Sequence, residues 1–581
     1  MLHSSRLLAT LFLVILSFTS CQNSENSSDA NQTKIAGNLR ALSQSERAQD
    51  FDQLLALFKT YYGPYDYKER ILKINIENEA NRLKALAISA KTDEEFAGYV
   101  MQLGAILKDG HVQIEIKNTS SGTSHFRIPI LLTPIEDKAI VANIDPSLIA
   151  ETNIMIGDEI IEVDGKTPAE YMTLITKYSG WATRVSQKHA IYNLFIRPSY
   201  MTELIPTKPT AKVRFKKADN SIHVQEIAWT LSKYNADLDK MINISTEVAH
   251  PFLNLEFDRA KEMNSVTTSP DSDVRKMGDV NPFFLTEKAQ EKYNFTKVYP
   301  SDESRKKAGL AENEKPPIFA AKYKHQDKNI LLVRIATYSP ADFKYPTYLK
   351  AYTALLKEFQ DSVDVLVLDQ THNPGGRISY CSGLYDLFAK KMDSSVVQQC
   401  NADRKWINNY KIDLPSQMAK STPWTARLAQ SMGLLIEKAY DNGSRLSEPL
   451  PVFTGSTYSL GESVWQKPTL VLIDELAGSC ADIFPMLIKE NKRAKLFGQT
   501  TMGLGGNVEE VGILNNSNIG IKMTRGLFSA YKENGNYTDA DLIENNGVTP
   551  DIEYSHTVSD FRNGYISYIE AFSNEAVLVV K

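Results

Sequence analysis

The chain has 581 residues, of which 42% are hydrophobic and 23% are charged; this composition is typical of globular proteins, and the length predicts three or four domains. The net charge of −5 is not gathered into strong blocks, which argues against a nucleic-acid-binding protein, so we expect no nucleic-acid partner. No two of the four cysteines, Cys21, Cys381, Cys400 and Cys480, are spaced as a CxxC pair. We therefore expect neither a disulfide framework nor a zinc site, although a single disulfide between Cys381 and Cys400 stays open.

The first residues have the pattern of an export signal. Arg6 provides a positive start, and residues 7–18 form an apolar stretch that is too short to span a membrane as a mature helix. The ending Phe18-Thr-Ser-Cys21 resembles a bacterial lipoprotein signal, in which Cys21 becomes the lipidated first residue. Phe18 is less usual there than leucine, so ordinary signal cleavage also stays open.

We therefore expect a lipoprotein signal peptide at 1–21 and a flexible polar tether at 22–42. No later run is long enough for a transmembrane helix. The mature protein is expected to work outside the cytoplasm, attached by its lipid to a bacterial cell envelope, in the periplasm or at the cell surface.

Residues 43–125 are expected to form an N-terminal helical region. Phe51, Leu54 and Phe58 repeat at helical spacing, and residues 96–107 show a similar pattern. This pattern ends at Asp109-Gly-His111, after which alternating apolar residues predict a strand. A histidine at such a turn is more often structural than catalytic, so His111 taken alone is the weaker candidate for a catalytic residue.

Residues 126–233 change to short predicted strands around a helix that begins at Pro168. The run from Ile156 to Gly165 resembles part of a PDZ domain, and Asp164-Gly165 is typical of a hairpin turn. PDZ domains bind extended peptide ends along a sheet edge, so this module could hold a substrate terminus or serve only as a scaffold.

From residue 326 to 581 the pattern predicts an α/β core. Predicted strands at 329–335 and 363–369 flank a helix at 345–359, which indicates a parallel sheet with covering helices. Residues 234–325 read as an insertion or linker, and residues 390–465 as an insertion within the core.

Two turns in this core present groups that acyl transfer requires. Ser479 lies where the buried strand 468–473 gives way to a helix, a position that exposes a hydroxyl beside backbone N–H groups. Gly375 and Gly376 follow another strand, where their N–H groups can point at an anion or a carbonyl oxygen. Taken locally, the pattern favours a helix-capping serine at Ser479 and a plain tight turn at the two glycines over catalytic roles.

Four motifs together resemble the C-terminal-processing (tail-specific) serine peptidase family, and more closely its tricorn-like branch. They are Asp109-Gly-His111, the PDZ-like Gly157 to Gly165, Leu368 to Gly376, and Gly478-Ser-Cys-Ala-Asp-Ile483 followed by Gly498 to Gly505. The resemblance implies an α/β multidomain fold, with an N-terminal helical segment, a PDZ-like β-rich domain and a ClpP/crotonase-like peptidase core. It also implies protein or peptide substrates, no cofactor and no metal.

The general base departs from the better-known branch of that family, which uses a lysine. The corresponding residue here is Leu504, which cannot take a proton. In the tricorn-like branch the base is a histidine, for which His111 is the match, and a C-terminal glutamate orients it, for which Glu544 is the best match. Asp539, Asp541 or a structural salt bridge remain alternatives to that role of Glu544.

The resemblance thus implies an extracytoplasmic serine endopeptidase with Ser479 as nucleophile, His111 as base and Glu544 as orienting acid. Backbone N–H groups of Gly376 (or Gly375) and Cys480 would bind the oxyanion. His372 is a rival base, and the Cys480 thiol a rival nucleophile. A catalytically inactive peptide- or ligand-binding module of the same fold, and a PDZ-based scaffold at the membrane, are the alternatives to an enzyme.

Overall fold

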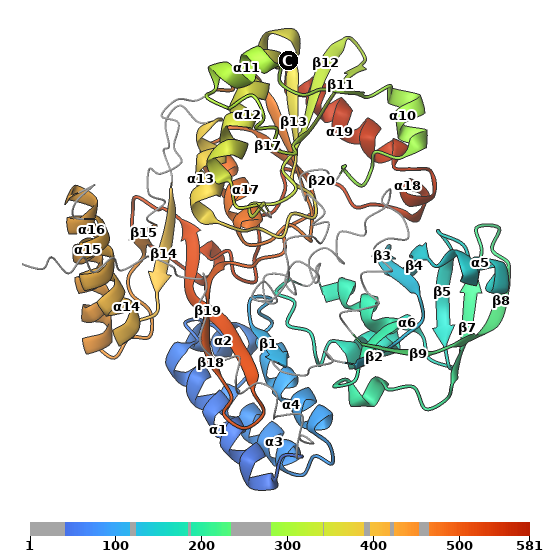
Figure 1. Ribbon diagram of the computed structural model, residues 1–581, viewed down its shortest axis with the longest axis vertical. Coiled ribbons are helices and arrows are strands. Elements are labelled where there is room, and N and C mark those ends of the chain that lie inside the picture. Colours follow the sequence, from blue (N-terminus) through green and yellow to red (C-terminus); the bar gives the residue numbers. More distant parts are fainter. Residues whose placement is uncertain are drawn as a thin grey trace, which may run out of the picture.

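The computed structural model describes residues 41–116, 124–183, 187–233, 281–340, 342–388, 395–418, 423–452 and 464–580 (Figure 1). The predicted signal peptide with Cys21, most of the tether, and residues 234–280 of the predicted linker lie outside these ranges. Within them, no helix is both long and apolar enough to cross a membrane.

Four helices form the N-terminal region, as the apolar spacing predicts, and they lie at the bottom of Figure 1. They are α1 (Gln44–Tyr61), α2 (Tyr65–Leu72), α3 (Ile76–Ile88) and α4 (Asp93–Ala105). Ser43, Asn75 and Thr92 cap α1, α3 and α4 by accepting a backbone N–H in the first turn. After α4 the chain passes through His111 into β1 (Gln113–Ile116), which pairs with β19 (Ile519–Ala530) and so joins this region to the core.

The second region is the predicted β-rich domain. An antiparallel sheet in the order β3-β4-β5-β7-β8 comprises β3 (Ile130–Ile135), β4 (Lys138–Ile144), β5 (Glu159–Val163), β7 (Thr210–Lys216) and β8 (Ile222–Ala228). A smaller sheet joins β2 (Ser124–Arg127) to β6 (Ile196–Pro198) and β9 (Thr230–Lys233). The helical pieces are α5 (Pro146–Thr152), α6 (Pro168–Ile175), η2 (Lys188–Leu194) and η3 (Thr202–Leu204).

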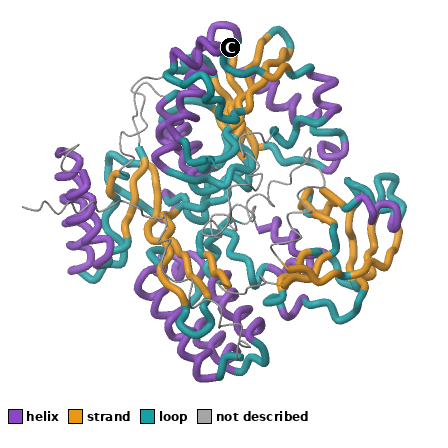
Figure 2. The backbone as a smooth tube through the Cα atoms, viewed as in Figure 1, coloured by secondary structure: helices purple, strands orange, loops and turns teal. Residues whose placement is uncertain are grey.

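The core is a seven-stranded sheet covered on both faces (Figures 1 and 2). Its order is β10 (Thr296–Lys297), β11 (Phe319–His325), β12 (Lys328–Arg334), β13 (Val365–Asp369), β16 (Thr469–Ile473), β17 (Lys495–Gly498) and β20 (Ile552–Glu553). From β12 to β20 neighbouring strands are parallel, and β10 and β11 are antiparallel additions.

Successive strand residues enter opposite hydrophobic layers, as the pleat of a sheet requires. Leu366 and Leu368 pack with α12 (Tyr345–Phe359), α13 (Ile378–Asp386) and α17 (Cys480–Glu490). Val365 and Val367 pack with α10 (Glu287–Tyr293) and α19 (Ile566–Leu578). The sheet is therefore buried on both sides, which explains the continuous apolar runs of β13 and β16.

The structure corrects the predicted start of the core at 326. Residues 281–325, which were expected to belong to an insertion or linker, include α10, β10, α11 (Asp302–Lys307) and β11, and both strands are part of the core sheet. The sequence pattern missed them because β10 has only two residues and charged segments lie on either side.

The expected insertion at 390–465 is partly integrated into a second sheet. This sheet has the order β1-β19-β14-β15, in which β14 (Val396–Cys400) and β15 (Leu450–Pro451) come from the insertion, and β18 (Gly506–Ile513) also pairs with β19. Helical segments of this insertion stand at the left of Figure 1: α14 (Arg404–Asn408), the π-helix η6 (Asn409–Asp413), α15 (Leu414–Met418) and α16 (Pro423–Asp441). Cys381 and Cys400 are both free, so the bridge left open by the sequence is not formed.

The remaining short elements are η5 (Gln360–Ser362), η7 (Asp539–Asp541) and α18 (Val558–Arg562). The loops that follow β13, β16 and β17 leave the sheet at its carboxyl edge, and the sequence motifs meet there.

Candidate active site

Ser479 occupies a strained turn between β16 and α17. Its backbone has φ +59° and ψ −117°, whereas the capping residues Ser43 and Thr92 have φ −70° and −132° with ψ near 160°. A non-glycine residue in such a conformation costs on the order of 1–3 kcal/mol and occurs where the surrounding structure enforces it. Ser479 does stand at the N-cap position, but its conformation is that of a nucleophile turn rather than of an ordinary cap.

Asp482 holds this turn from within the first turn of α17. Its fully buried carboxylate accepts the N–H of Ser479 at 2.7 Å and the N–H groups of Gly503 and Leu504 at 2.9 Å each, and it also accepts the hydroxyl of Thr501. Burial raises the pKa of Asp482 to about 6, against the effect of these donors. This one side chain therefore joins the Ser479 turn to the loop after β17.

The glycine loop lies directly against Ser479. A Cβ atom on Gly375, whose φ is +92°, would be 2.6 Å from Ser479 Cβ and 3.0 Å from Cys480 N. The N–H of Gly375 donates to Asn373 Oδ1 at 2.9 Å, and Asn373 O accepts the N–H of Gly478 at 3.0 Å. In the described part of the chain, the N–H groups of Gly376 and Cys480 have no protein acceptor.

The two rival residues of this region face elsewhere. The thiol of Cys480 donates to Gly376 O at 3.0 Å, on the back of the glycine loop. The Nε2 atom of His372 lies 3.3 Å from Asp474 Oδ2, and its ring stacks edge-on against Phe283, with centroids 4.7 Å apart, beside α19. The structure thus gives both side chains other partners.

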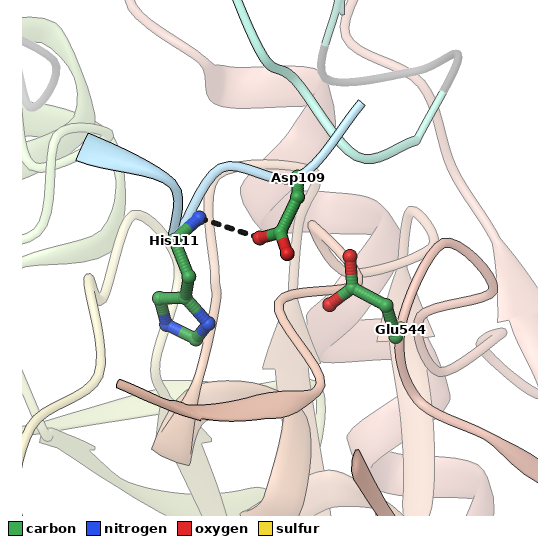
Figure 3. Close-up of side chains that lie close together, drawn as sticks. All are labelled: Asp109, His111 and Glu544. Carbon is green, nitrogen blue, oxygen red and sulfur yellow. Dashed lines mark hydrogen bonds between the residues drawn. The ribbon is translucent and has the colours of Figure 1, made fainter. Parts of the chain in front are cut away.

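His111 lies in the turn between α4 and β1, with 7% of its surface exposed. Its backbone N–H donates to Asp109 Oδ1 at 2.8 Å. Its imidazole, the Asp109 carboxylate and the Glu544 carboxylate each contribute an atom to a group in which all the atoms lie within 4.8 Å of one another (Figure 3). The structure therefore brings His111 and Glu544 together.

Leu504 connects this group to the nucleophile turn. A Cβ atom on Gly110 would be 2.6 Å from Leu504 Cδ2, and one on Gly478 would be 2.9 Å from Leu504 Cδ1. The residues that precede His111 and Ser479 thus pack against the same buried side chain. A side chain at either position would require Leu504 to shift.

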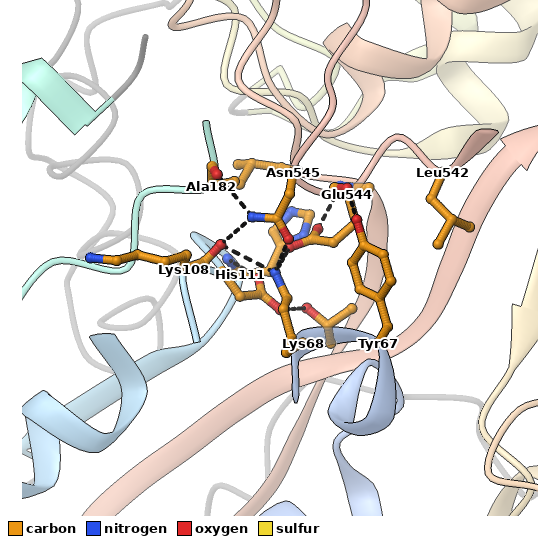
Figure 4. Close-up of polar contacts among 12 residues, drawn as sticks. Tyr67, Lys68, Lys108, His111, Ala182, Leu542, Glu544 and Asn545 are labelled. Atoms are coloured by element: carbon orange, nitrogen blue, oxygen red, sulfur yellow. Dashed lines mark hydrogen bonds and ion pairs between the residues drawn. The ribbon is translucent and has the colours of Figure 1, made fainter. Parts of the chain in front are cut away.

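Glu544 is fully buried and is fixed by several groups (Figure 4). Its Oε1 pairs with Lys68 of α2, and its Oε2 accepts the N–H of Gly505 at 2.9 Å. The Tyr67 hydroxyl donates to its backbone oxygen at 2.6 Å. Burial and the nearby Asp109 raise the pKa of Glu544 to about 8, and Lys68 opposes them.

The alternatives to Glu544 lie at the surface. Asp539 pairs with Arg70 at 2.6 Å, and Asp541 pairs with Lys532 at 2.5 Å. A salt bridge of Glu544 does exist, with Lys68, and it forms beside His111 rather than away from it. Lys68 could not be identified from the sequence, because the residue lies in an ordinary helical stretch and contacts Glu544 only in the folded chain.

Asp109, His111 and Glu544 could also be regarded as potential metal ligands. The Asp109 oxygens accept from His111 N–H, the Tyr62 hydroxyl and the Thr524 hydroxyl, and the Glu544 oxygens accept from Lys68 and Gly505. Every carboxylate oxygen therefore has a protein donor, and an ammonium group already provides the positive charge. This donor set suits proton chemistry better than metal coordination.

Comparison with known proteins supports the interpretation of the regions. The family model described as peptidase family S41 matches residues 329–554, and a PDZ domain model matches residues 123–241. An uncharacterized protein of Chlamydia muridarum is 26% identical over 465 residues, covering 72% of this chain and 74% of that protein. A protein of Chlamydia pneumoniae is 23% identical over 584 residues, covering 93% of this chain and 91% of that protein.

Solved structures share the fold at lower identity. The crystal structure of mature CPAF superposes with a TM-score of 0.70 at 19% identity, covering 92% of this chain and 98% of that chain. The structure of mature CPAF complexed with lactacystin superposes with a TM-score of 0.68 at 19% identity, covering 92% of this chain and 99% of that chain.

The predicted fold class is confirmed: a helical N-terminal region, a PDZ domain and an α/β peptidase core. The family match supports a serine-type hydrolase with protein or peptide substrates. Residues 329–554 thus match peptidase family S41, and the chain, with its PDZ-domain match, resembles the C-terminal-processing serine peptidases.

Proposed function

We propose that the chain is an extracytoplasmic serine endopeptidase that hydrolyses peptide bonds through an acyl-enzyme, with Ser479 as nucleophile, His111 as general base and Glu544 as the acid that orients the imidazole. The observation that carries this proposal is that His111 lies next to the buried Glu544. The turn that contains His111 and the turn that contains Ser479 both pack against the side chain of Leu504. A lysine base is absent at that place, and a histidine lies next to a carboxylate instead.

The proposed reaction begins when Ser479 Oγ attacks the substrate carbonyl carbon and its proton passes to His111. The imidazolium then gives this proton to the leaving amine, and the acyl group remains on Ser479. In the second half, His111 takes a proton from water as the water attacks the acyl-enzyme; the acyl–Oγ bond then breaks, the imidazolium returns the proton to Ser479 Oγ, and the new carboxyl end is released. Glu544 stabilises the imidazolium in both halves.

The oxyanion would be bound by the N–H groups of Gly376 and Cys480. Both lie beside Ser479 and have no protein acceptor in the described residues, whereas the N–H of Gly375 is already used by Asn373. Gly375 then has a steric role, since a side chain there would strike Ser479. Each oxyanion donor contributes about 3 kcal/mol to transition-state stabilisation in comparable enzymes.

The place of action is proposed from the first residues. The sequence up to Cys21 has the pattern of a lipoprotein signal, and the polar residues after it would let the folded regions stand away from the membrane. Labelling with radioactive palmitate, compared between the full chain and its Cys21→Ala variant, tests the anchor. Equal labelling of both would contradict it.

The proposed nucleophile and base are tested with a fluorophosphonate probe and an unfolded protein substrate. Ser479→Ala and His111→Ala should each reduce hydrolysis by more than about a thousandfold, and Ser479→Ala should abolish labelling. Glu544→Gln should reduce hydrolysis by about a hundredfold or more, since the imidazole loses its anionic partner.

His372→Ala is the matched control, because His372 is held by Asp474 and is expected to be dispensable for proton transfer. Undiminished hydrolysis by Ser479→Ala would refute the nucleophile. If His372→Ala loses probe labelling while His111→Ala retains it, His372 rather than His111 is the general base. A folded wild-type chain that binds peptides without cleaving them would instead favour the inactive binding module, for which Leu504 in place of lysine is the supporting observation.

A further inference from the structure

Lys68 is a completely buried ammonium group at the edge of the proposed site. Its Nζ atom pairs with Glu544 Oε1 and Asn545 Oδ1 and donates to Lys108 O at 3.1 Å (Figure 4). These three acceptors match the three N–H bonds of an ammonium group. A buried charge of this kind is costly unless it is paired, so its position calls for a reason beyond packing.

The reason lies in the two carboxylates beside His111. Asp109 is committed to the turn: its oxygens accept the backbone N–H of His111 and the hydroxyls of Tyr62 and Thr524. Glu544 lies close to the same imidazole. Burial, and after it the nearby charge of Asp109, raises the pKa of Glu544.

The charges balance only when Lys68 is included. Two carboxylates and one ammonium group carry a net charge of −1 while the His111 ring is neutral, and the net charge becomes zero when the ring takes up a proton. Without the Lys68 ammonium group, the buried site would keep a net charge of −1 even after the His111 ring has taken up a proton. Removal of Lys68 would therefore favour a proton on Glu544.

We propose that Lys68 is a positioning residue of the active site, whose buried ammonium group allows Glu544 to ionise beside Asp109 and so to serve as the anionic partner of His111. The proposal rests on the proposed function. It assigns Lys68 no contact with the substrate: the residue acts through Glu544.

The other titratable groups around Glu544 do not replace this charge. From α2 and the residues before it, Tyr67 and Tyr62 face the site, and burial raises the pKa of both phenols above the usual range, so they remain neutral. From the turn after α4 come Asp109 and His111, and the loop after β17 contributes only the backbone of Gly505. Lys68 is the one cationic side chain that the described residues place on Glu544.

The test is the pH dependence of kcat/KM with a fluorescently labelled casein. Because the pKa of Glu544 is raised to about 8 and the ionised form is required, the wild-type rate should rise as the pH increases through about 8. In Lys68→Met this rise should move upward by about one to two pH units, with at least about a tenfold lower rate at pH 7. Asp109→Asn should move it downward, and the double variant, which restores the charge balance, should return it toward the wild-type position.

Arg70→Met is the matched control, because it removes a cation from the same helix, where Arg70 forms a surface pair with Asp539. Its profile should coincide with that of the wild type. The proposal would be overturned if the pH profile of kcat/KM for Lys68→Met coincides with that of the wild type, or if its values are lower at every pH while the rise stays at the same pH. Either result would make Lys68 a purely structural residue. If Lys68→Met does not fold, Asp109→Asn decides, and a rise that is unmoved or moved upward contradicts the proposal.

Infrared spectroscopy gives a readout that does not need turnover. The carboxyl band that disappears in Glu544→Gln should titrate at a higher pH in Lys68→Met than in the wild type and in Arg70→Met. An inert wild-type chain would refute the proposed function and leave this measurement intact. Equal titration of the band with and without Lys68 would refute the role of Lys68 alone.

Discussion

Leu504 explains why a lysine base does not fit this site. The side chain is 2% exposed and packs between Gly110 and Gly478, in a cluster with Leu131, Leu476 and Met502. The Ser479 turn and the His111 turn pack closely around this side chain and leave little room for a longer lysine side chain. The same contact that excludes the lysine sets the distance between the nucleophile turn and the histidine turn.

Leu504→Lys should therefore fail to restore a serine–lysine pair. An ammonium group in this apolar cluster loses its hydration, so we expect a loss of roughly 3 kcal/mol in the free energy of unfolding and no recovery of probe labelling in the His111→Ala background. Denaturant unfolding and labelling measure the two effects. Leu504→Met, which conserves volume, should cost less than about 1.5 kcal/mol; labelling of Leu504→Lys/His111→Ala at the wild-type rate would contradict the account.

At the scale of the element, α17 is organised by its third residue. Asp482 accepts four donors that belong to the Ser479 turn and to the loop carrying Leu504. The strained φ of Ser479 is maintained by these bonds. The motif Gly-Ser-Cys-Ala-Asp therefore contains both the proposed nucleophile and the side chain that shapes its turn.

Asp482→Asn should disturb this turn, because an amide nitrogen would face backbone N–H donors on one side. We expect a cost of about 2–3 kcal/mol in stability and a fall in kcat of about tenfold or more, measured by thermal unfolding and casein hydrolysis. Glu170→Gln is the control, since Glu170 holds the same position in the exposed capping box of α6. Equal, small effects of both substitutions would show that Asp482 is only a helix cap.

The sequence predicted elements well where the pattern is local. The helix expected at 345–359 is found at those bounds, and the strand expected at 363–369 is found at Val365–Asp369. The proposed nucleophile turn and glycine loop follow from such patterns. Lys68 and the short strand β10 could not be predicted, because an ion pair and a two-residue strand are defined by partners far away in the chain.

At the scale of the whole molecule, three regions meet at the site. Asn545 joins them: its side-chain amide donates to Lys108 O at 2.7 Å and to Ala182 O at 2.8 Å, and its oxygen accepts from Lys68. Lys68 and Lys108 come from the N-terminal helical region, Ala182 from the PDZ domain, and Asn545 from the core. The hydrogen bonds of this one side chain therefore join all three regions.

Asn545→Ala should loosen this junction. We expect a loss of about 2 kcal/mol in the free energy of unfolding and a fall in kcat of at least about tenfold, since Glu544 is the preceding residue. Asn546→Ala is the matched control, because among the described residues the Asn546 side-chain amide donates to the nearby backbone oxygens of Asp539 and Leu542. Denaturant unfolding and hydrolysis should separate the two variants; equal behaviour would assign Asn545 a local role.

The pairing of Lys68 with Glu544 joins residues 476 positions apart. On the proposed assignment, a chain in the course of synthesis and export carries its base long before it carries its nucleophile or the acid that orients the base. Hydrolysis then has to wait until the late residues have folded back onto the early helices. The order of the chain would thereby protect the ribosome and the export machinery from a protease that is still passing through them.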